Sequence, residues 1–128
     1  MIYIDSAVLL ASAFAEPRSP PAALWDENLG SSRLLAYEVW TRIHAYGVAA
    51  SHGNLTAARL SRVSLTELGQ SVLARALQPF PVPVRPLDAL HLATMDYLRR
   101  QGEAVELASY DNRLIAAAEA LGIPIATL

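Results

Sequence analysis

The sequence has neither cysteine nor lysine, and all ten of its basic residues other than histidine are arginine. Without cysteine there is no disulfide framework, no thiolate nucleophile and no cysteine-based zinc site. Without lysine there is no Schiff-base chemistry and no P-loop, which needs its Gly-Lys pair. Receiver domains and haloacid-dehalogenase-type phosphatases normally keep a lysine beside the transferred phosphoryl group, so the sequence argues against these classes too.

Long hydrophobic runs are also missing. No apolar stretch approaches the roughly 20 residues of a membrane span, and the first residues lack the basic region of a signal peptide. We therefore expect a cytoplasmic protein that makes no use of a membrane. The hydrophobic content of 53% and mean hydropathy of +0.27 exclude a disordered chain. A chain of 128 residues is expected to form one domain, residues 1–128.

The net charge of −2 is not that of a protein whose whole surface grips nucleic acid. Short apolar runs alternate with segments of helical spacing, which predicts βαβ units and a mainly parallel sheet covered on both faces. The residue after Ile123 is a proline, which belongs on an edge strand. The predicted strands are residues 2–5, 33–35, 62–65, 104–109 and 123–125, and the predicted helices are 7–15, 20–27, 36–50, 55–61, 66–77, 86–100 and 112–121.

Four acidic residues stand inside or directly after hydrophobic segments: Asp5, Glu38, Asp88 and Asp111. A buried carboxylate must be paired or must coordinate a cation. In open α/β sheets, functional groups collect at the carboxyl ends of the strands, where Asp5 and Asp111 are predicted to lie. A cluster of hard oxygen ligands suits Mg²⁺ or Mn²⁺. The pattern indicates a site for a divalent metal ion.

Each of these acids also has an ordinary interpretation. Asp5 and Asp111 can cap the N-termini of the helices that follow them. Asp88 lies in a first helical turn, where the helix dipole favours an acid, although its face is apolar. Glu38 projects away from the apolar stripe of its helix, which is typical of a solvated glutamate. A fifth acid, Asp96, lies on the side of neighbouring arginines and is interpreted as a solvated ion pair outside the site.

Hydroxyl and imidazole groups accompany the acids. Ser6 and Ser109 adjoin Asp5 and Asp111 and can hold a water or a phosphate oxygen, although cap and turn roles fit them equally well. We expect His91 to be a packed core histidine, and His44 and His52 to lie at the surface. No pair of histidines has an arrangement suited to metal-free acid–base catalysis.

Four blocks of this sequence together resemble the PIN-domain ribonucleases, and especially the VapC-type toxins of bacterial and archaeal toxin–antitoxin pairs. The blocks occur in the family's order and span almost the entire chain. They are Tyr3-Ile4-Asp5-Ser6, Ala36-Tyr37-Glu38-Val39, Leu87-Asp88-Ala89-Leu90-His91-Leu92-Ala93-Thr94 and Ala108-Ser109-Tyr110-Asp111-Asn112-Arg113-Leu114, with Leu121-Gly122-Ile123-Pro124 at the end.

The resemblance implies a three-layer α/β/α sandwich with a short parallel five-stranded sheet. It implies that Asp5, Glu38, Asp88 and Asp111 are the catalytic and metal-binding quartet, with Ser109 as the family's small hydroxyl. The implied activity is hydrolytic, endonucleolytic cleavage of tRNA, rRNA or mRNA by water that Mg²⁺ or Mn²⁺ activates. The implied partners are the RNA substrate, a cognate antitoxin protein and a second copy of the chain in a homodimer.

Two other functions stay open at this point. The chain can be a catalytically inactive PIN-like module that binds RNA or protein, although the presence of all four acids argues against this. It can also be an interaction protein whose acids only cap helices. Stabilisation by metal separates these alternatives from a nuclease, because a ligand that binds only the folded state raises its melting temperature. Whether one or two metal ions bind also stays open.

Overall fold

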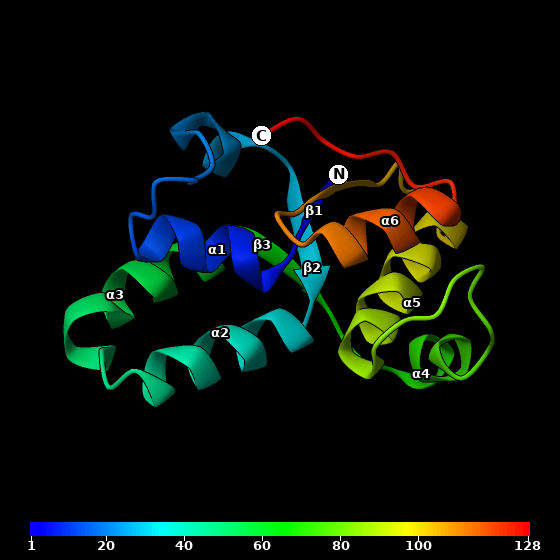
Figure 1. Cartoon of the computed structure of the whole chain (residues 1–128), viewed down its shortest axis with the longest axis horizontal. Helices are drawn as coiled ribbons and strands as arrows, with labels where there is room; N and C mark the ends of the chain where they lie inside the picture. Colours follow the sequence, from blue (N-terminus) through cyan, green and yellow to red (C-terminus); the bar gives the residue numbers. More distant parts are fainter.

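A four-stranded parallel sheet forms the centre of the computed structural model, which describes residues 1–128. The strands are β1 (Ile2–Ile4), β2 (Leu29–Ser32), β3 (Val63–Thr66) and β4 (Glu106–Ala108), in the order β3-β2-β1-β4. Helices cover both faces (Figure 1). This arrangement confirms the predicted three-layer α/β/α class.

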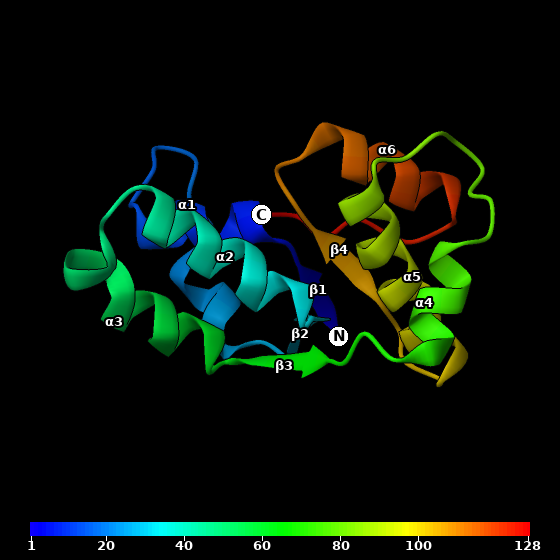
Figure 2. The same ribbon diagram turned by 90° about the horizontal axis from the view of Figure 1, so that it is seen from below.

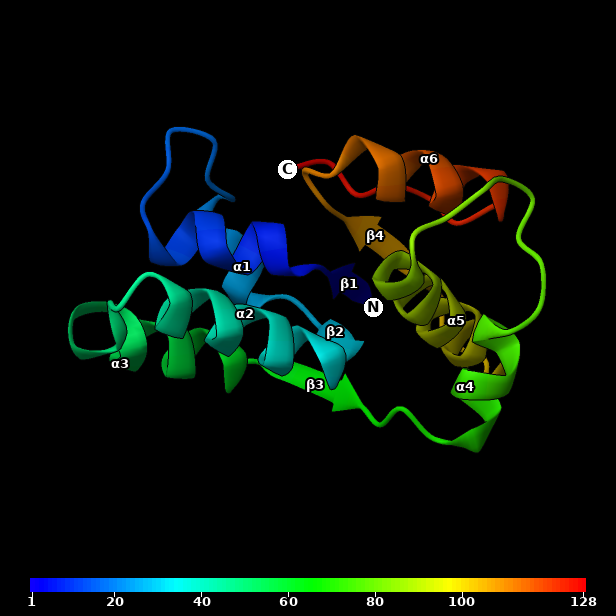
Figure 3. The same ribbon diagram turned by 60° about the horizontal axis from the view of Figure 1, so that its bottom comes forward.

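One helical layer contains α1 (Ser6–Ala13), α2 (Leu34–Ala45) and α3 (Ala49–Leu60). The other contains α4 (Gln70–Ala76), α5 (Pro86–Arg100) and α6 (Asn112–Ala120). Figures 2 and 3 show the sheet between these two groups. A short 3-10 helix, η1 (Ala22–Asp26), precedes β2.

Successive residues of β1 supply the two hydrophobic cores, because side chains of a strand alternate between the faces of the sheet. Ile4 belongs to the core under α1 and α2, together with Leu35. Tyr3 belongs to the core under α5 and α6, together with Leu107. All four side chains are fully buried. The sheet is therefore held from both sides, and its carboxyl edge is fixed in position.

The second strand lies earlier than predicted. Residues 29–32 form it, whereas the predicted strand 33–35 is the start of α2, whose first residue is Leu34. The sequence Leu-Gly-Ser-Ser is typical of a turn, but tight packing requires its small residues. A Cβ atom at Gly30 would overlap the Met1 Sδ, and the Ser31 Oγ donates to the Ile4 carbonyl at 2.7 Å. Tertiary packing overrides local propensity here.

The predicted fifth strand is reduced to one bridge, so the sheet has four strands rather than five. Leu107 of β4 pairs with Ile125, and the Leu107 N–H donates to the Pro124 carbonyl at 2.8 Å. Pro124 has no N–H to extend the ladder. The segment does lie at the sheet edge, as the proline indicated.

Two predicted helical segments also need correction. The predicted helix 36–50 ends at Ala45, and α3 begins at Ala49 after a turn at Gly47, whose φ of +66° favours glycine. The predicted helix 66–77 is only Gln70–Ala76. It is joined to α5 by an ion pair of 2.8 Å between Arg75 and Asp96, so Asp96 is largely shielded rather than solvated.

None of the helices combines the length and apolar character that spanning a membrane requires.

The central position of Leu107 makes it a test of this packing. Leu107→Ala should lower the free energy of unfolding by about 2–5 kcal/mol, because it leaves a cavity in a fully buried cluster. The matched control is Leu77→Ala, which truncates a side chain that is 89% exposed and should change stability by less than about 0.5 kcal/mol. Urea denaturation measures both. Equal losses in the two variants would contradict this description of the core.

Candidate active site

Asp5 and Asp111 follow the two strands between which the strand order reverses. β1 and β4 are parallel neighbours, and their helices α1 and α6 leave on opposite faces of the sheet. Each acid caps its helix. The Asp5 Oδ1 accepts from the Val8 N–H at 3.1 Å, and the Asp111 Oδ1 accepts from the Arg113 N–H at 2.9 Å. The capping interpretation is correct, and it brings both carboxylates to the same edge.

Asp5 is the buried member of the pair, with 4% of its surface exposed. The Ser109 Oγ donates to the Asp5 Oδ2, and the same Oγ accepts from the Asp111 N–H at 2.9 Å. Desolvation raises the pKa of Asp5, and the hydrogen bonds from Ser109 and the Val8 N–H offset this only in part. Ser109 thus links the two acids, and Asp5 itself has no ion pair.

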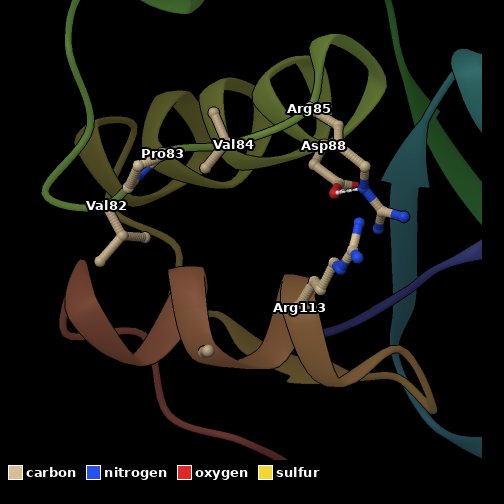
Figure 4. Close-up of a pocket in the computed structure, with 7 residues that line it drawn as sticks. Val82, Pro83, Val84, Arg85, Asp88 and Arg113 are labelled. Carbon is tan, nitrogen blue, oxygen red and sulfur yellow. Dashed lines mark hydrogen bonds and ion pairs between the residues drawn. The ribbon is translucent and has the colours of Figure 1, made fainter.

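Arg85 bridges the other two carboxylates of this edge. Its Nε donates to the Asp88 Oδ2 and its Nη2 donates to the Asp111 Oδ2, both at 2.7 Å; Figure 4 shows the first of these contacts. Hydrogen bonds and charge attraction from Asp88 and Asp111 raise the pKa of Arg85. Desolvation alone would raise the pKa of Asp111, but the contacts with Arg85 and two backbone N–H groups lower it.

Glu38 turns inward from α2 and meets a histidine of α5. The His91 Nε2 lies 2.6 Å from the Glu38 Oε1, and the Glu38 side chain is 20% exposed, so its interpretation as a solvated residue is wrong. The His91 Nδ1 lies 2.7 Å from the Tyr3 hydroxyl, which also accepts from the Ser32 N–H at 3.1 Å. An ionised carboxylate can only accept, so the hydrogen bond to Glu38 is donated by the His91 Nε2–H.

The four acids therefore lie on two connected networks. One runs from Asp5 through Ser109 to Asp111 and through Arg85 to Asp88; the other joins Glu38 to His91. Asp5 is influenced by both networks, because the charge of His91 lowers its pKa and the charge of Asp111 raises it. Of the hydroxyls predicted beside the acids, Ser109 has this role, whereas Ser6 begins α1 without a recorded side-chain hydrogen bond.

A divalent cation fits the chemistry of these donors but not their present arrangement. All four acids offer hard oxygen atoms, which Mg²⁺ and Mn²⁺ prefer. No three acidic or histidine side chains are close enough together to hold one ion. Arg85 occupies one oxygen each of Asp88 and Asp111. A metal that bound through these two oxygens would require Arg85 to release them.

Comparison with known proteins agrees with this geometry. The family model of the PIN domain matches residues 2–120. The chain belongs to the PIN-domain family.

Three curated relatives come from Mycobacterium tuberculosis, and each alignment covers nearly all of both chains. Ribonuclease VapC46 of strain ATCC 25618 / H37Rv is 31% identical to this PIN domain over 97% of this chain and 95% of the relative. Ribonuclease VapC35 of the same strain is 32% identical over 98% and 95%. Ribonuclease VapC47 of strain CDC 1551 / Oshkosh is 27% identical over 99% and 96%. The resemblance to VapC-type PIN domains is confirmed.

Sequence reasoning missed three residues of this PIN domain's site: Arg85, His91 and Tyr3. His91 was correctly expected to be buried, but its contact with Glu38 joins residues 53 positions apart. Arg85 lies in the proline-rich connection of residues 79–86 and stands three residues before Asp88. The spacing of three residues between Arg85 and Asp88 was the one signal in the sequence that could have revealed this ion pair. His44 is exposed, as expected, whereas His52 is half-buried beside Phe14.

Removing the buried charge of Asp5 should stabilise the PIN domain when no metal is present. Ionising Asp5 costs stability because its pKa in the folded state lies above the ordinary value of 3.8. The loss of stability therefore grows as the pH rises from 3.8 to the folded-state pKa, and it persists at pH 7.5. Asp5→Asn should therefore raise the melting temperature by a few degrees in EDTA at pH 7.5. Asparagine keeps an oxygen for the Val8 N–H.

The gain should shrink as the pH is lowered toward 3.8, because Asp5 then becomes protonated in the folded state as well as in the unfolded state. Asp26→Asn, which changes an exposed acid of η1, is the matched control and should leave the melting temperature unchanged. A fall in melting temperature for Asp5→Asn at pH 7.5, with Asp26→Asn unchanged, would show that the Asp5 charge stabilises the fold.

Proposed function

We propose that this PIN domain is a Mg²⁺- or Mn²⁺-dependent endoribonuclease and the toxin of a type II toxin–antitoxin pair. The observation that carries the proposal is the linkage of three acids at the switch point of the sheet. Ser109 joins Asp5 to Asp111, and Asp111 shares Arg85 with Asp88. Membership of the PIN-domain family and the ribonuclease names of the relatives support it. The proposed catalytic residues are Asp5, Glu38, Asp88 and Asp111.

Each acid has a role that its surroundings support. Asp5, Asp88 and Asp111 would hold the cation, with the Asp5 carboxylate oriented by Ser109 and the Val8 N–H. Glu38 would complete the site with its Oε2, because His91 engages its Oε1. A bound divalent ion supplies charge neutralisation at the scissile phosphate and lowers the pKa of an attacking water. Asp5 and Ser109 exclude bulk water from the inner side of the site, since both are buried.

Partner proteins belong to the same proposal. Exposed apolar side chains adjoin two of the acids, since Tyr37 precedes Glu38 and is 65% exposed, and Leu87 precedes Asp88 and is 45% exposed. Such residues beside an acidic site suit a protein cover that blocks it, as an antitoxin would. A homodimer is proposed from the family resemblance alone. Trp25, by contrast, is buried in the core and offers nothing to a partner.

The reaction can be tested on total cellular RNA with and without EDTA. We expect cleavage only with Mg²⁺ or Mn²⁺, and product ends that carry a 3′-hydroxyl and a 5′-phosphate, because water rather than the 2′-hydroxyl attacks. Asp88→Asn should reduce the rate by at least about 100-fold, the order of loss when a group that stabilises the transition state is removed. Asp26→Asn should cleave as the wild type does. Cleavage that resists EDTA, or 2′,3′-cyclic ends, would reject the mechanism.

Competition between Arg85 and the metal gives a separate prediction. Arg85→Gln should bind Mn²⁺ several-fold more tightly than the wild type, because no guanidinium then occupies the oxygens of Asp88 and Asp111. Arg113→Gln removes the same charge nearby without removing an ion pair, so it controls for the general change in field. Calorimetric titration with Mn²⁺ measures both. Equal affinities of the two variants would mean that Arg85 does not compete.

A further inference from the structure

Arg113 differs from every other arginine of the chain. Its side chain takes part in no ion pair, no hydrogen bond and no stacking on an aromatic ring. Only its backbone N–H is engaged, since it donates to the Asp111 Oδ1. The other nine all have a partner: Arg18 on the Tyr110 ring, Arg33 with Glu67, Arg42 with Tyr46, Arg59 on the Trp25 ring, Arg62 with the Trp25 carbonyl, Arg75 and Arg100 with Asp96, Arg85 with Asp88 and Asp111, and Arg99 with the Leu121 carbonyl.

The unpaired guanidinium lies at a pocket of about 470 Å³ beside the acidic site. Figure 4 shows Arg113 extending from α6 toward Arg85, with Asp88 at the same end of the pocket. The Nε and Nη2 of Arg85 are engaged with the acids, which leaves its Nη1 without a recorded partner. Because Arg85 is already paired with two acids, the guanidinium of Arg113 is the uncompensated positive charge at this end of the pocket.

An unpaired guanidinium favours an anion, and its planar geometry is suited to a phosphate. The remaining wall is apolar, formed by Val82 and Val84 from the proline-rich connection and by Ala116 from α6. An apolar wall beside a phosphate-binding end matches a nucleotide, whose base or ribose needs a surface to pack on. The pocket volume also lies within the roughly 300–1,000 Å³ of small-molecule sites.

We propose that this pocket, defined by Arg113, Arg85, Val82, Val84 and Ala116, binds the nucleotide next to the scissile phosphate of a single-stranded RNA. Arg113 is the phosphate contact, and the valines and Ala116 pack against the nucleoside. This inference rests on the proposed ribonuclease function, because it takes the adjoining carboxylates as the place of cleavage. The substrate enters along the side of α6 on which Arg113 and Ala116 lie.

Binding can be measured without cleavage in the Asp5→Asn variant, with Mg²⁺ and a fluorescent single-stranded RNA of 12 randomised nucleotides. Adding Arg113→Gln should weaken the affinity by roughly tenfold, the order expected for one charge-assisted hydrogen-bonded contact. It should also reduce the salt dependence of log K by about 0.7, the loss of one phosphate contact on a single strand. Arg42→Gln, an exposed arginine of α2, is the charge-matched control and should change neither quantity.

A second variant tests the apolar wall. Ala116→Phe fills the pocket without altering charge, so it should weaken binding and leave the salt dependence unchanged. The exposed position of Ala116 on α6 should let the fold tolerate the larger side chain, which the melting temperature checks.

Equal RNA affinity in the Arg113→Gln and Arg42→Gln variants would overturn the pocket assignment. The assignment would also fail if Arg113→Gln kept the RNA affinity of its parent but lost binding to an acidic polyglutamate peptide. The pocket would then suit a protein segment rather than RNA. Cleavage by the wild-type chain separates the two claims. If the wild type cleaves RNA and Arg113→Gln binds it unchanged, only the pocket fails; if the wild type never cleaves RNA, the proposed function fails.

Discussion

Mutual repulsion among carboxylates at one edge of the sheet is the constraint on which the rest of this site depends. The fold ends β1 and β4 side by side, and each strand is followed by an acid that caps the next helix. Two further acids arrive on α2 and α5. Charges of one sign this close raise each other's free energy unless a cation lies between them. In this structure the protein supplies that compensation itself, through Arg85 on Asp88 and Asp111.

The two sides of the site are stabilised differently, and this gives them different proposed roles. Glu38 is fixed by His91, which is itself fixed by Tyr3 from the buried face of β1. That chain of hydrogen bonds is enclosed by the core and has little freedom to rearrange. Arg85 lies on an exposed connection and its side chain is about half exposed (48%), so it can withdraw. A rigid side at Glu38 and a movable side at Arg85 suit a site in which a divalent metal ion replaces the Arg85 guanidinium.

Sequence reasoning found those features whose signals are local. The predicted helix 86–100 has the same bounds as α5, and isolated acids within apolar runs pointed to all four carboxylates. It failed where contacts between distant residues decide the structure. Residues 29–32 form a strand through pairing with β1 and β3, and the partners of Arg85 and His91 become adjacent only in the folded chain. The alternative interpretation of Glu38 as a solvated residue failed because helix periodicity does not reveal a histidine on another helix.

The most direct test of this account follows the Arg85 side chain itself during a Mg²⁺ titration of ¹⁵N-labelled protein. The account predicts that the Arg85 Nε–Hε resonance shifts with a saturable dependence on Mg²⁺, because the metal takes the oxygens of Asp88 and Asp111. The Nε–Hε resonance of Arg75, which is paired with Asp96 away from the site, should stay unchanged. Saturable Mg²⁺ binding that leaves the Arg85 resonance in place would contradict the claim that the two cations exchange at one site.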